Sequence, residues 1–409
     1  MTPVRCLLIA NIFAPIHGGS AVVYEHLCRY SPPGAIRVLA PWRHYLSGQE
    51  IEGWRAHDET ATYPISRVEL LRPLAREGGS SLLRSGWGFL TEDLPLKLRV
   101  LREVQRIVRE HGINVICVGE LNSGSWIGVA ARRLWGCRMV SYIHGEEVTA
   151  QTSYRLYGRN RRRYLQAADA VVAVSDFTRR ALLELMGVPP GKIELIHNGV
   201  DTQRFSPGPR NDALLERLGV RGRRVILSVG RLVPRKGMDK LIEALPRIRR
   251  AVPDVMLLIV GEGDYREELQ RLIDANAVQD NAVLVGKVSH DELVELYRSC
   301  DFFAMPNRHM PDGDTEGFGL VFLEANACGK AVIGGRAGGA VEAVRDGENG
   351  LLVDGAAPHE IADAAIRLLT DDALRKRMEA RAIEIATASS CRVRAAQFHA
   401  LCQRLVRKS

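Results

Sequence analysis

The sequence has no segment suited to a membrane crossing and no pattern typical of a secreted, disulfide-bonded protein. Its longest apolar runs, such as Val255–Val260, have the length of a strand, whereas a membrane helix needs about 20 apolar residues. A strand-like run begins almost at the first residue, so we expect no signal peptide. The 8 cysteines are scattered without a C-x-x-C pair, which favours buried thiols in a reducing cytoplasm.

Motifs for a metal or a dinucleotide are also missing. The 11 histidines show no H-E-x-x-H or similar ligand spacing, so we expect neither a metal site nor a bound cofactor. Asp312 and Asp314 have D-x-D spacing, but they lie in a polar loop of their own and we expect them to be solvated. Neither half of the chain carries the full G-x-G-x-x-G fingerprint, which argues against a nicotinamide dehydrogenase.

The net positive charge lies almost wholly in the first half of the chain. Residues 1–206 contain 26 Lys and Arg against 19 Asp and Glu, an excess of 7 in a net charge of +8. The densest basic cluster is Arg155, Arg159, Arg161, Arg162 and Arg163. A basic face attracts phosphate-bearing partners. No aromatic, base-reading motif accompanies the cluster, so we expect no nucleic-acid partner.

Strand-like apolar runs alternate with helical patterns, which predicts an α/β protein with parallel sheets covered on both faces. The expected strands form two series, at 4–10, 36–40, 115–118, 139–143, 170–174 and 193–196, then at 225–229, 255–260, 282–285, 302–305, 331–333 and 351–353. Two series predict two doubly wound, Rossmann-like domains. A turn-rich segment at 206–209 divides them into residues 1–206 and 207–389. We expect the last helix, about 390–409, to pack back on the first domain.

Glycine turns follow predicted strands in both domains. Gly18 and Gly19 lie between the first strand and a helix, Gly230 follows the first strand of the second series, and Gly261 follows the next. Ligands of parallel sheets bind at the carboxyl ends of strands, and glycine lets the backbone approach a phosphate closely. Each turn taken alone is equally typical of a tight turn without a ligand.

Two cations five residues apart flank a proline-containing loop after Gly230. Arg231 can bind phosphate through two hydrogen bonds, and Lys236 adds a point charge. Together they would neutralise a diphosphate leaving group as its charge develops. We expect the neighbouring Arg235 to face solvent. The alternative for the whole segment is a solvated basic loop.

Two carboxylates are separated by eight positions near the middle of the second series. Glu316 ends a polar loop, and Glu324 lies in an apolar run, where a buried carboxylate needs partners. A helix beginning near Phe318 would point its first amides at whatever Glu316 holds, and helix N-termini suit negative ligands or polyols. The spacing, roughly 12 Å along a helix, matches the separation of sugar and ribose in a nucleotide-sugar. The alternative is an amphipathic helix with two incidental acids.

Together these motifs resemble those of the family 4 retaining glycosyltransferases, whose GT-B fold has two facing Rossmann-like domains and a deep interdomain cleft. The resemblance spans nearly the whole chain. The sequence of residues 311–319 is most similar to that of bacterial phosphatidylinositol-mannoside and polysaccharide mannosyltransferases. The matching segments are Gly18-Gly19, His144-Gly145, His197–Asp201, Gly230-Arg231, Lys236-Gly237, Gly261 with Gly263, and Glu316 with Glu324.

The resemblance implies roles for several of these residues. Arg231 and Lys236 would stabilise the diphosphate, Glu316 would hold the donor sugar, Glu324 would hold the ribose, and His144 would touch the transferred sugar. The implied catalytic residues are His144, Arg231, Lys236 and Glu316. The implied donor-binding residues are Gly18, Gly19, Gly230, Gly261, Val288, Phe318, Gly319, Leu320 and Glu324. Taken alone, His144 is as often a structural histidine as a ligand.

The predicted reaction is metal-independent transfer of a hexosyl group, with retention, from a nucleotide-diphospho-sugar to a lipid-linked or saccharide acceptor. GDP-mannose is the favoured donor, with a UDP-sugar as the alternative. A sugar-nucleotide 2-epimerase and a non-catalytic sugar-nucleotide binding protein remain as rival functions. Residues 70–108 interleave apolar and basic side chains, which predicts peripheral contact between a cytoplasmic protein and an anionic membrane. A helix pair packed on the first sheet would explain the same pattern.

Overall fold

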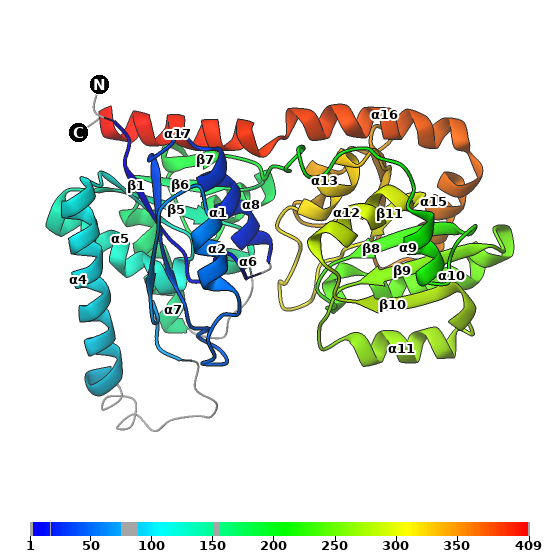
Figure 1. Cartoon of the computed structure of the whole chain (residues 1–409), viewed down its shortest axis with the longest axis horizontal. Helices are drawn as coiled ribbons and strands as arrows, with labels where there is room; N and C mark the ends of the chain where they lie inside the picture. Colours follow the sequence, from blue (N-terminus) through cyan, green and yellow to red (C-terminus); the bar gives the residue numbers. More distant parts are fainter. Residues whose placement is uncertain (1–2, 17, 75–88, 150–154, 408–409) are drawn as a thin grey trace.

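A computed structural model of the chain contains two parallel sheets with helices on both faces (Figure 1). It describes residues 3–16, 18–74, 89–149 and 155–407. One sheet has seven strands in the order β3-β2-β1-β4-β5-β6-β7, and the other has six in the order β10-β9-β8-β11-β12-β13. All of their ladders are parallel. The predicted pair of doubly wound sheets is therefore confirmed.

The strands agree with the predicted series to within about two residues at each end. The first sheet contains β1 (Cys6–Ile9), β2 (Ile36–Pro41), β3 (Ile65–Val68), β4 (Val115–Val118), β5 (Arg138–Ile143), β6 (Ala170–Ala173) and β7 (Ile193–Leu195). The second contains β8 (Arg224–Val229), β9 (Val255–Val260), β10 (Ala282–Gly286), β11 (Phe302–Met305), β12 (Val332–Gly335) and β13 (Gly350–Val353). Strand β3 was not predicted, because this half-buried edge strand reads Ile-Ser-Arg-Val and has no continuous apolar run.

Helices connect and cover the strands of both sheets. In the first half they are α1 (Gly19–Tyr30), α2 (Trp54–Thr60), α4 (Leu94–His111), α5 (Leu121–Trp135), α6 (Glu146–Thr149), α7 (Arg155–Ala167) and α8 (Asp176–Glu184), with short turns η1 (Phe89–Asp93) and η2 (Pro190–Lys192). In the second half they are α9 (Asp212–Arg217), α10 (Met238–Ala251), α11 (Arg266–Ala275), α12 (His290–Ser299), α13 (Leu320–Ala327), α14 (Ala340–Ala343), α15 (Pro358–Thr370), α16 (Asp372–Ala388) and α17 (Cys391–Arg407), with η3 (Pro234–Lys236) and η4 (Gln279–Asn281).

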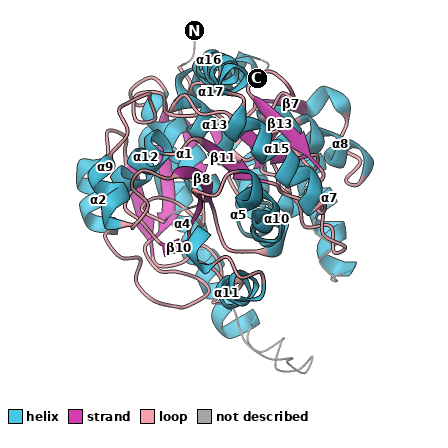
Figure 2. Cartoon of the chain, turned by 90° about the vertical axis from the view of Figure 1, so that its right-hand side faces the viewer, coloured by secondary structure: helices cyan, strands magenta, loops and turns pink. Residues whose placement is uncertain are grey.

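The strands lie inside the molecule, enclosed by helices (Figure 2). Every residue of β1, β4, β6 and β9 is buried, as expected for parallel strands covered on both faces. Such strands have their carboxyl ends along one edge of each sheet, where ligands of doubly wound folds bind. The loops at these edges therefore decide where the site lies.

The two C-terminal helices join the two halves. Helix α16 lies over the second half and α17 lies over the first (Figure 1). Helix α17 packs against α1, and its Arg404 forms an ion pair of 2.8 Å with Glu194 of β7. The limits of the two domains, at residues 206 and 389, stay a prediction.

The region expected to touch a membrane is described only in part. Residues 75–88 lie outside the described residues, and the rest is mostly α4. One face of α4 packs on the first sheet through Val100, Val104 and Ile107, while Leu94 and Leu98 remain 38% and 45% exposed. No helix in the described part of the chain is long and apolar enough to span a bilayer.

The densest basic cluster is not one continuous exposed face. The side chains of Arg155 and Arg159 lie outside the described residues. Arg161 is only 7% exposed, and Arg162 donates to the carbonyl oxygen of Leu185 at 2.9 Å. At least part of this charge therefore anchors α7 to its own half of the molecule.

Candidate functional site

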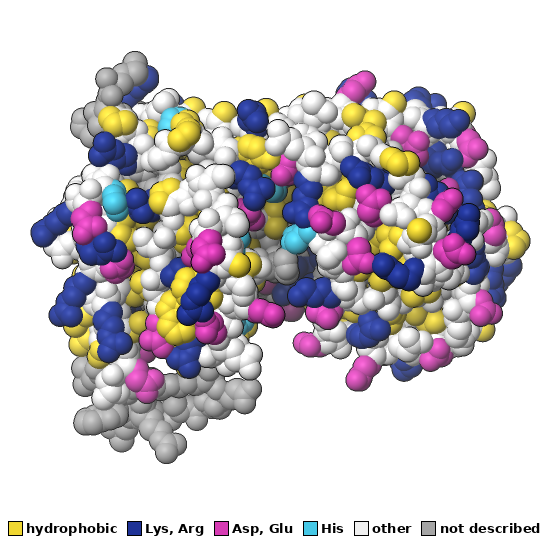
Figure 3. Space-filling model, in the orientation of Figure 1, with side chains coloured by type: hydrophobic (Ala, Val, Ile, Leu, Met, Phe, Trp, Pro, Cys, Tyr) yellow, Lys and Arg dark blue, Asp and Glu magenta, His cyan; other side chains and the backbone are white. Residues whose placement is uncertain are grey.

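A groove is visible between the two halves of the molecule (Figure 3), and backbone contacts bring predicted site residues of the two halves together. A Cβ placed on Gly317 would lie 2.0 Å from the carbonyl oxygen of His144, so the two backbones are in direct contact there. A Cβ placed on Gly19, at the start of α1, would lie 3.9 Å from Leu320 at the start of α13. These contacts bring His144 and Gly19 of the first half next to residues 317–320 of the second half.

Lys236 and Glu316 form the central ion pair of the second half. The Lys236 ammonium donates to Oε2 of Glu316 at 2.5 Å, and the two side chains are only 11% and 13% exposed. Burial alone would raise the pKa of Glu316, but Lys236 and Arg235 hold that pKa below its usual value. The site thus contains an ionised carboxylate and an ammonium, positioned before any ligand is bound.

The expectation that Arg235 faces solvent is wrong. Arg235 is 8% exposed, and its guanidinium donates to Oδ1 of Asp314 at 2.9 Å. Asp314 is half-buried, so the expectation of a solvated D-x-D pair is also wrong for this residue. The contact arises because the η3 turn folds Arg235 back on the 307–316 loop, and a buried guanidinium requires a carboxylate partner.

Arg231, in contrast, presents its charge to solvent at the end of β8. Its side chain is exposed and has no hydrogen bond or ion pair within the described part of the chain. The Gly230 carbonyl beside it would lie 2.0 Å from a Cβ on Gly261, where φ is +138°. Gly261 is therefore explained by the close approach of two loops, without a ligand.

The helix after Glu316 begins at Leu320, two residues later than expected. Gly319 precedes it in a left-handed conformation with φ of +88°, and a Cβ there would lie 2.6 Å from the Phe322 ring. The Phe318 amide donates to the Glu316 carboxylate. The backbone just before α13 therefore lies against the Glu316 carboxylate, and the role of the α13 amides stays a prediction.

Glu324 has the buried polar partner that its apolar surroundings require. The Tyr297 hydroxyl donates to its Oε2 at 2.9 Å. Burial raises the pKa of Glu324 despite this hydrogen bond. Tyr297, on α12, was not identified from the sequence, because the contact joins two helices 27 positions apart.

His144 is held by a tyrosine of the first helix. Its Nε2 lies 2.8 Å from the Tyr24 hydroxyl, which itself donates to the carbonyl oxygen of Gly119. Because that hydroxyl proton is already used, Nε2 carries the imidazole hydrogen. Burial lowers the pKa of His144 to about 4, so the ring is neutral at pH 7.

Glu147, which was not predicted as a site residue, holds the backbone at His144. Its Oε2 accepts the backbone amides of His144 at 3.2 Å and Gly145 at 3.1 Å, which fixes the turn after β5. Burial raises its pKa to about 7. The remaining predicted positions lie at loop ends: Gly18 caps α1, and Val288 is half-buried after the edge strand β10.

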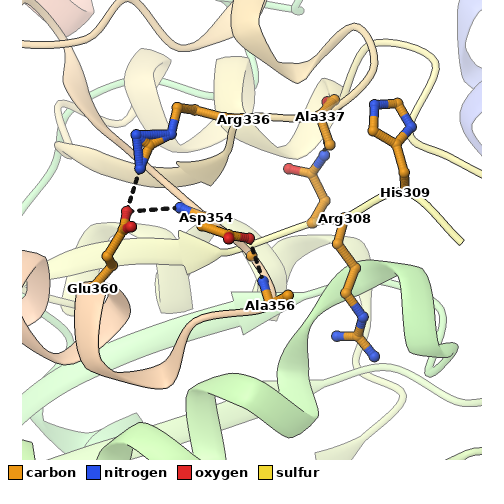
Figure 4. Close-up of a pocket in the computed structure, with 9 residues that line it drawn as sticks. Arg308, His309, Arg336, Ala337, Asp354, Ala356 and Glu360 are labelled. Carbon is orange, nitrogen blue, oxygen red and sulfur yellow. Dashed lines mark hydrogen bonds and ion pairs between the residues drawn. The ribbon is translucent and has the colours of Figure 1, made fainter.

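A separate pocket of about 570 Å³ opens at the carboxyl ends of β11, β12 and β13 (Figure 4). None of the predicted site residues lines it. Its charges are paired within the protein: Arg336 contacts Glu360, and Arg308 forms two hydrogen bonds of 2.8 Å with Asp239. Across the described ranges, no group of three or more His, Cys, Asp or Glu residues is arranged to hold a metal ion.

Two family models match the chain. The model described as Glycosyltransferase Family 4 matches residues 69–204, and the model described as Glycosyl transferases group 1 matches residues 213–385. The second match includes all six strands of the second sheet, whereas the first includes β4 to β7 and begins after β1, β2 and β3.

Curated relatives extend this similarity over most of the chain. A GDP-mannose-dependent alpha-(1-6)-phosphatidylinositol monomannoside mannosyltransferase of Mycolicibacterium smegmatis is 39% identical over 308 residues, 73% of this chain and 78% of that protein. The enzyme of the same name from Mycobacterium tuberculosis is 34% identical over 378 residues, 90% of this chain and 89% of that protein.

Solved structures support the fold. Alr3699/HepE of Anabaena, in complex with UDP and glucose, has a TM-score of 0.76 at 22% identity, with 98% of this chain and 99% of that chain covered. Sucrose-phosphate synthase of Thermosynechococcus elongatus has a TM-score of 0.77 at 22% identity, with 99% and 100% covered. The predicted GT-B fold is confirmed. With its two parallel-sheet domains, its family-model matches and its relatives at 34–39% identity, the chain belongs to family 4 of the glycosyltransferases and is a glycosyltransferase.

Proposed function

We propose that the protein transfers a mannosyl group from GDP-mannose to an acceptor in glycolipid biosynthesis. The observation that carries this proposal is the buried Lys236–Glu316 ion pair, which is followed directly by Gly317, whose backbone contacts the His144 carbonyl of the other half. The relatives from Mycolicibacterium and Mycobacterium are named as GDP-mannose-dependent enzymes acting on a phosphatidylinositol mannoside, which supports this donor and a lipid-linked acceptor.

In this proposal the second half binds the donor. Arg231 and Lys236 stabilise the diphosphate as its bond to the sugar breaks, because preorganised cations lower the cost of developing negative charge. Glu316 and the amides of Phe318, Gly319 and Leu320 hold the sugar and its phosphate. Glu324 then holds the ribose, and Val288 lies where the base would rest.

The first half presents the acceptor. Neutral His144, with its Nε2 hydrogen directed at Tyr24, can contact a sugar without adding charge to the site. The acceptor hydroxyl attacks on the face that the diphosphate leaves, and its proton passes to a phosphate oxygen. Configuration is retained, and no further base is needed. In this proposal residues 1–206 form the acceptor-binding domain and residues 207–389 form the donor-binding domain.

The two cations remove the need for a metal ion at the diphosphate, so we propose metal-independent transfer. A 2-epimerase of similar fold is not favoured, since the family matches and relatives are transferases. The residues proposed to bind the diphosphate and those proposed to bind the sugar are all present. Their joint presence argues against a protein that only binds a sugar nucleotide.

Donor and stereochemistry can be tested together. A panel of sugar nucleotides is incubated with the protein, and nucleoside-diphosphate release is measured with and without EDTA. We expect GDP release from GDP-mannose at a rate that EDTA does not change, and NMR of a transferred product should show an unchanged anomeric configuration. An inverted product, or activity lost with EDTA and restored by Mg²⁺, would contradict the mechanism.

We also propose peripheral contact with an anionic membrane. The support is the exposed pair Leu94 and Leu98 on α4, in a region that also carries Lys97 and Arg102. Each basic residue near such a surface adds about 1 kcal/mol of attraction. Sedimentation with anionic vesicles should capture the protein at low salt and release it at high salt. Leu98→Asp should weaken capture, whereas Leu134→Asp, at an exposed leucine of α5, serves as the matched control.

A further inference from the structure

Glu342 joins the two halves through three hydrogen bonds. It lies on α14 of the second half, and its Oε2 accepts the Asp176 amide of the first half at 2.7 Å. Its Oε1 accepts the Phe177 amide at 3.0 Å. His197, also from the first half, approaches Oε2 through its Nε2 at 2.9 Å. The side chain is only 16% exposed, so most of it is buried at this junction.

Two of these hydrogen bonds cap the N-terminus of α8. The first amides of a helix have no partner within it and attract negative charge. In α8 the Thr178 amide is capped within the first half by Ser175, at 3.0 Å. The amides of Asp176 and Phe177 are instead capped by a carboxylate from the other half. Burial opposes the ionised form of Glu342, but His197 and the two amides hold its pKa below the usual value.

Backbone contacts connect the loop before Glu342 with Glu316 and Gly317, which belong to the segment proposed to bind the sugar. Three residues before Glu342, the Gly339 amide donates to the carbonyl oxygen of Glu316 at 2.8 Å. A Cβ on Gly339 would lie 2.0 Å from the carbonyl oxygen of Gly317, so the loop before α14 lies directly against this segment. Gly317 in turn touches the His144 carbonyl of the first half.

We propose that Glu342 is a positioning residue that fastens α14 to α8 and thereby holds the Glu316–Gly317 segment against His144. Its contribution to sugar transfer rests on the proposed function, whereas its part in joining the halves does not. A carboxylate is required because three donors converge on its two oxygens. A glutamine would place an NH₂ group against one of these donors.

The test compares Glu342→Gln with Glu243→Gln in the full-length protein. Glu243 is the matched control, since it is 29% exposed and its ion pair with Lys240 stays within α10. We expect Glu342→Gln to lower kcat at least about tenfold, because small displacements of positioned groups are costly. GDP binding should change less than about threefold, since the diphosphate contacts are untouched. Small-angle scattering should show a more extended particle for Glu342→Gln alone.

A second pair of variants separates positioning from folding. Glu342→Asp keeps the charge and should restore part of kcat, and His197→Gln, which still offers an N–H, should stay near the wild-type value. Unchanged scattering for Glu342→Gln would overturn the proposal, and so would a kcat equal to that of Glu243→Gln. If the unaltered protein released no nucleoside diphosphate from any donor, the proposed function would fail, and scattering alone would still decide whether Glu342 joins the halves.

Discussion

Replacing Arg231 or Lys236 by alanine is expected to lower kcat by about a hundredfold or more. Lys236 is 11% exposed and fixed on Glu316, so its charge is positioned before the reaction begins. Arg231 is exposed at the end of β8, where a diphosphate can reach it without displacing a protein partner. Negative charge grows on the leaving diphosphate, and either truncation removes a cation that stabilises it.

The matched controls are two cations on neighbouring helices. Lys240→Ala removes an ion pair within α10, and Arg271→Ala removes one within α11. Neither should change kcat more than about twofold, because both cations are paired within their own helix, and such pairs contribute less than about 1 kcal/mol to stability. The measurement is GDP release under single-turnover conditions. Near-normal turnover of Arg231→Ala would show that the diphosphate lies elsewhere.

The second large effect is expected for Glu316→Gln. The substitution preserves shape but leaves the Lys236 ammonium without a charged partner, and breaking such a buried pair costs about 3–5 kcal/mol of folding stability. Loss of the carboxylate that holds the sugar should also lower kcat by about a hundredfold.

Glu324→Ala should instead mainly raise KM for the donor, because the ribose is held equally in the ground and transition states.

Because of the Lys236–Glu316 pair, we expect the unaltered protein and the Glu316→Gln variant to differ in how much stability they lose at acid pH. The pKa of Glu316 is lower in the folded protein than in the unfolded chain. Its contribution to the free energy of unfolding is therefore present above the unfolded pKa and is lost as the pH falls through the folded pKa. Urea denaturation at pH 7 and at about pH 4 should show a smaller pH effect for Glu316→Gln than for the unaltered protein. Equal pH effects would mean that the pair does not carry this stability.

The fold could be predicted because its signals are local. A parallel strand buried on both faces reads as one apolar run, as Val255–Val260 does, and 12 of the strands were predicted, although Arg37 in β2 and Glu194 in β7 interrupt their runs. The family could be identified for the same reason. Its motif residues lie close together in the sequence, in the turn after β8 and in the turn before α13. The one strand that failed, β3, lies at the edge of its sheet with half-buried side chains, so its sequence has no such run.

The partners of the site residues were decided by the tertiary structure. Arg235 pairs with Asp314 across 79 positions, His144 meets Tyr24 across 120, and Glu342 caps Asp176 across 166. No local pattern marks these pairs, since each one forms only where helices and loops that are distant in the sequence pack together. A buried charge or a helix N-terminus requires a partner, but only the packing of the two halves determines which residue supplies it.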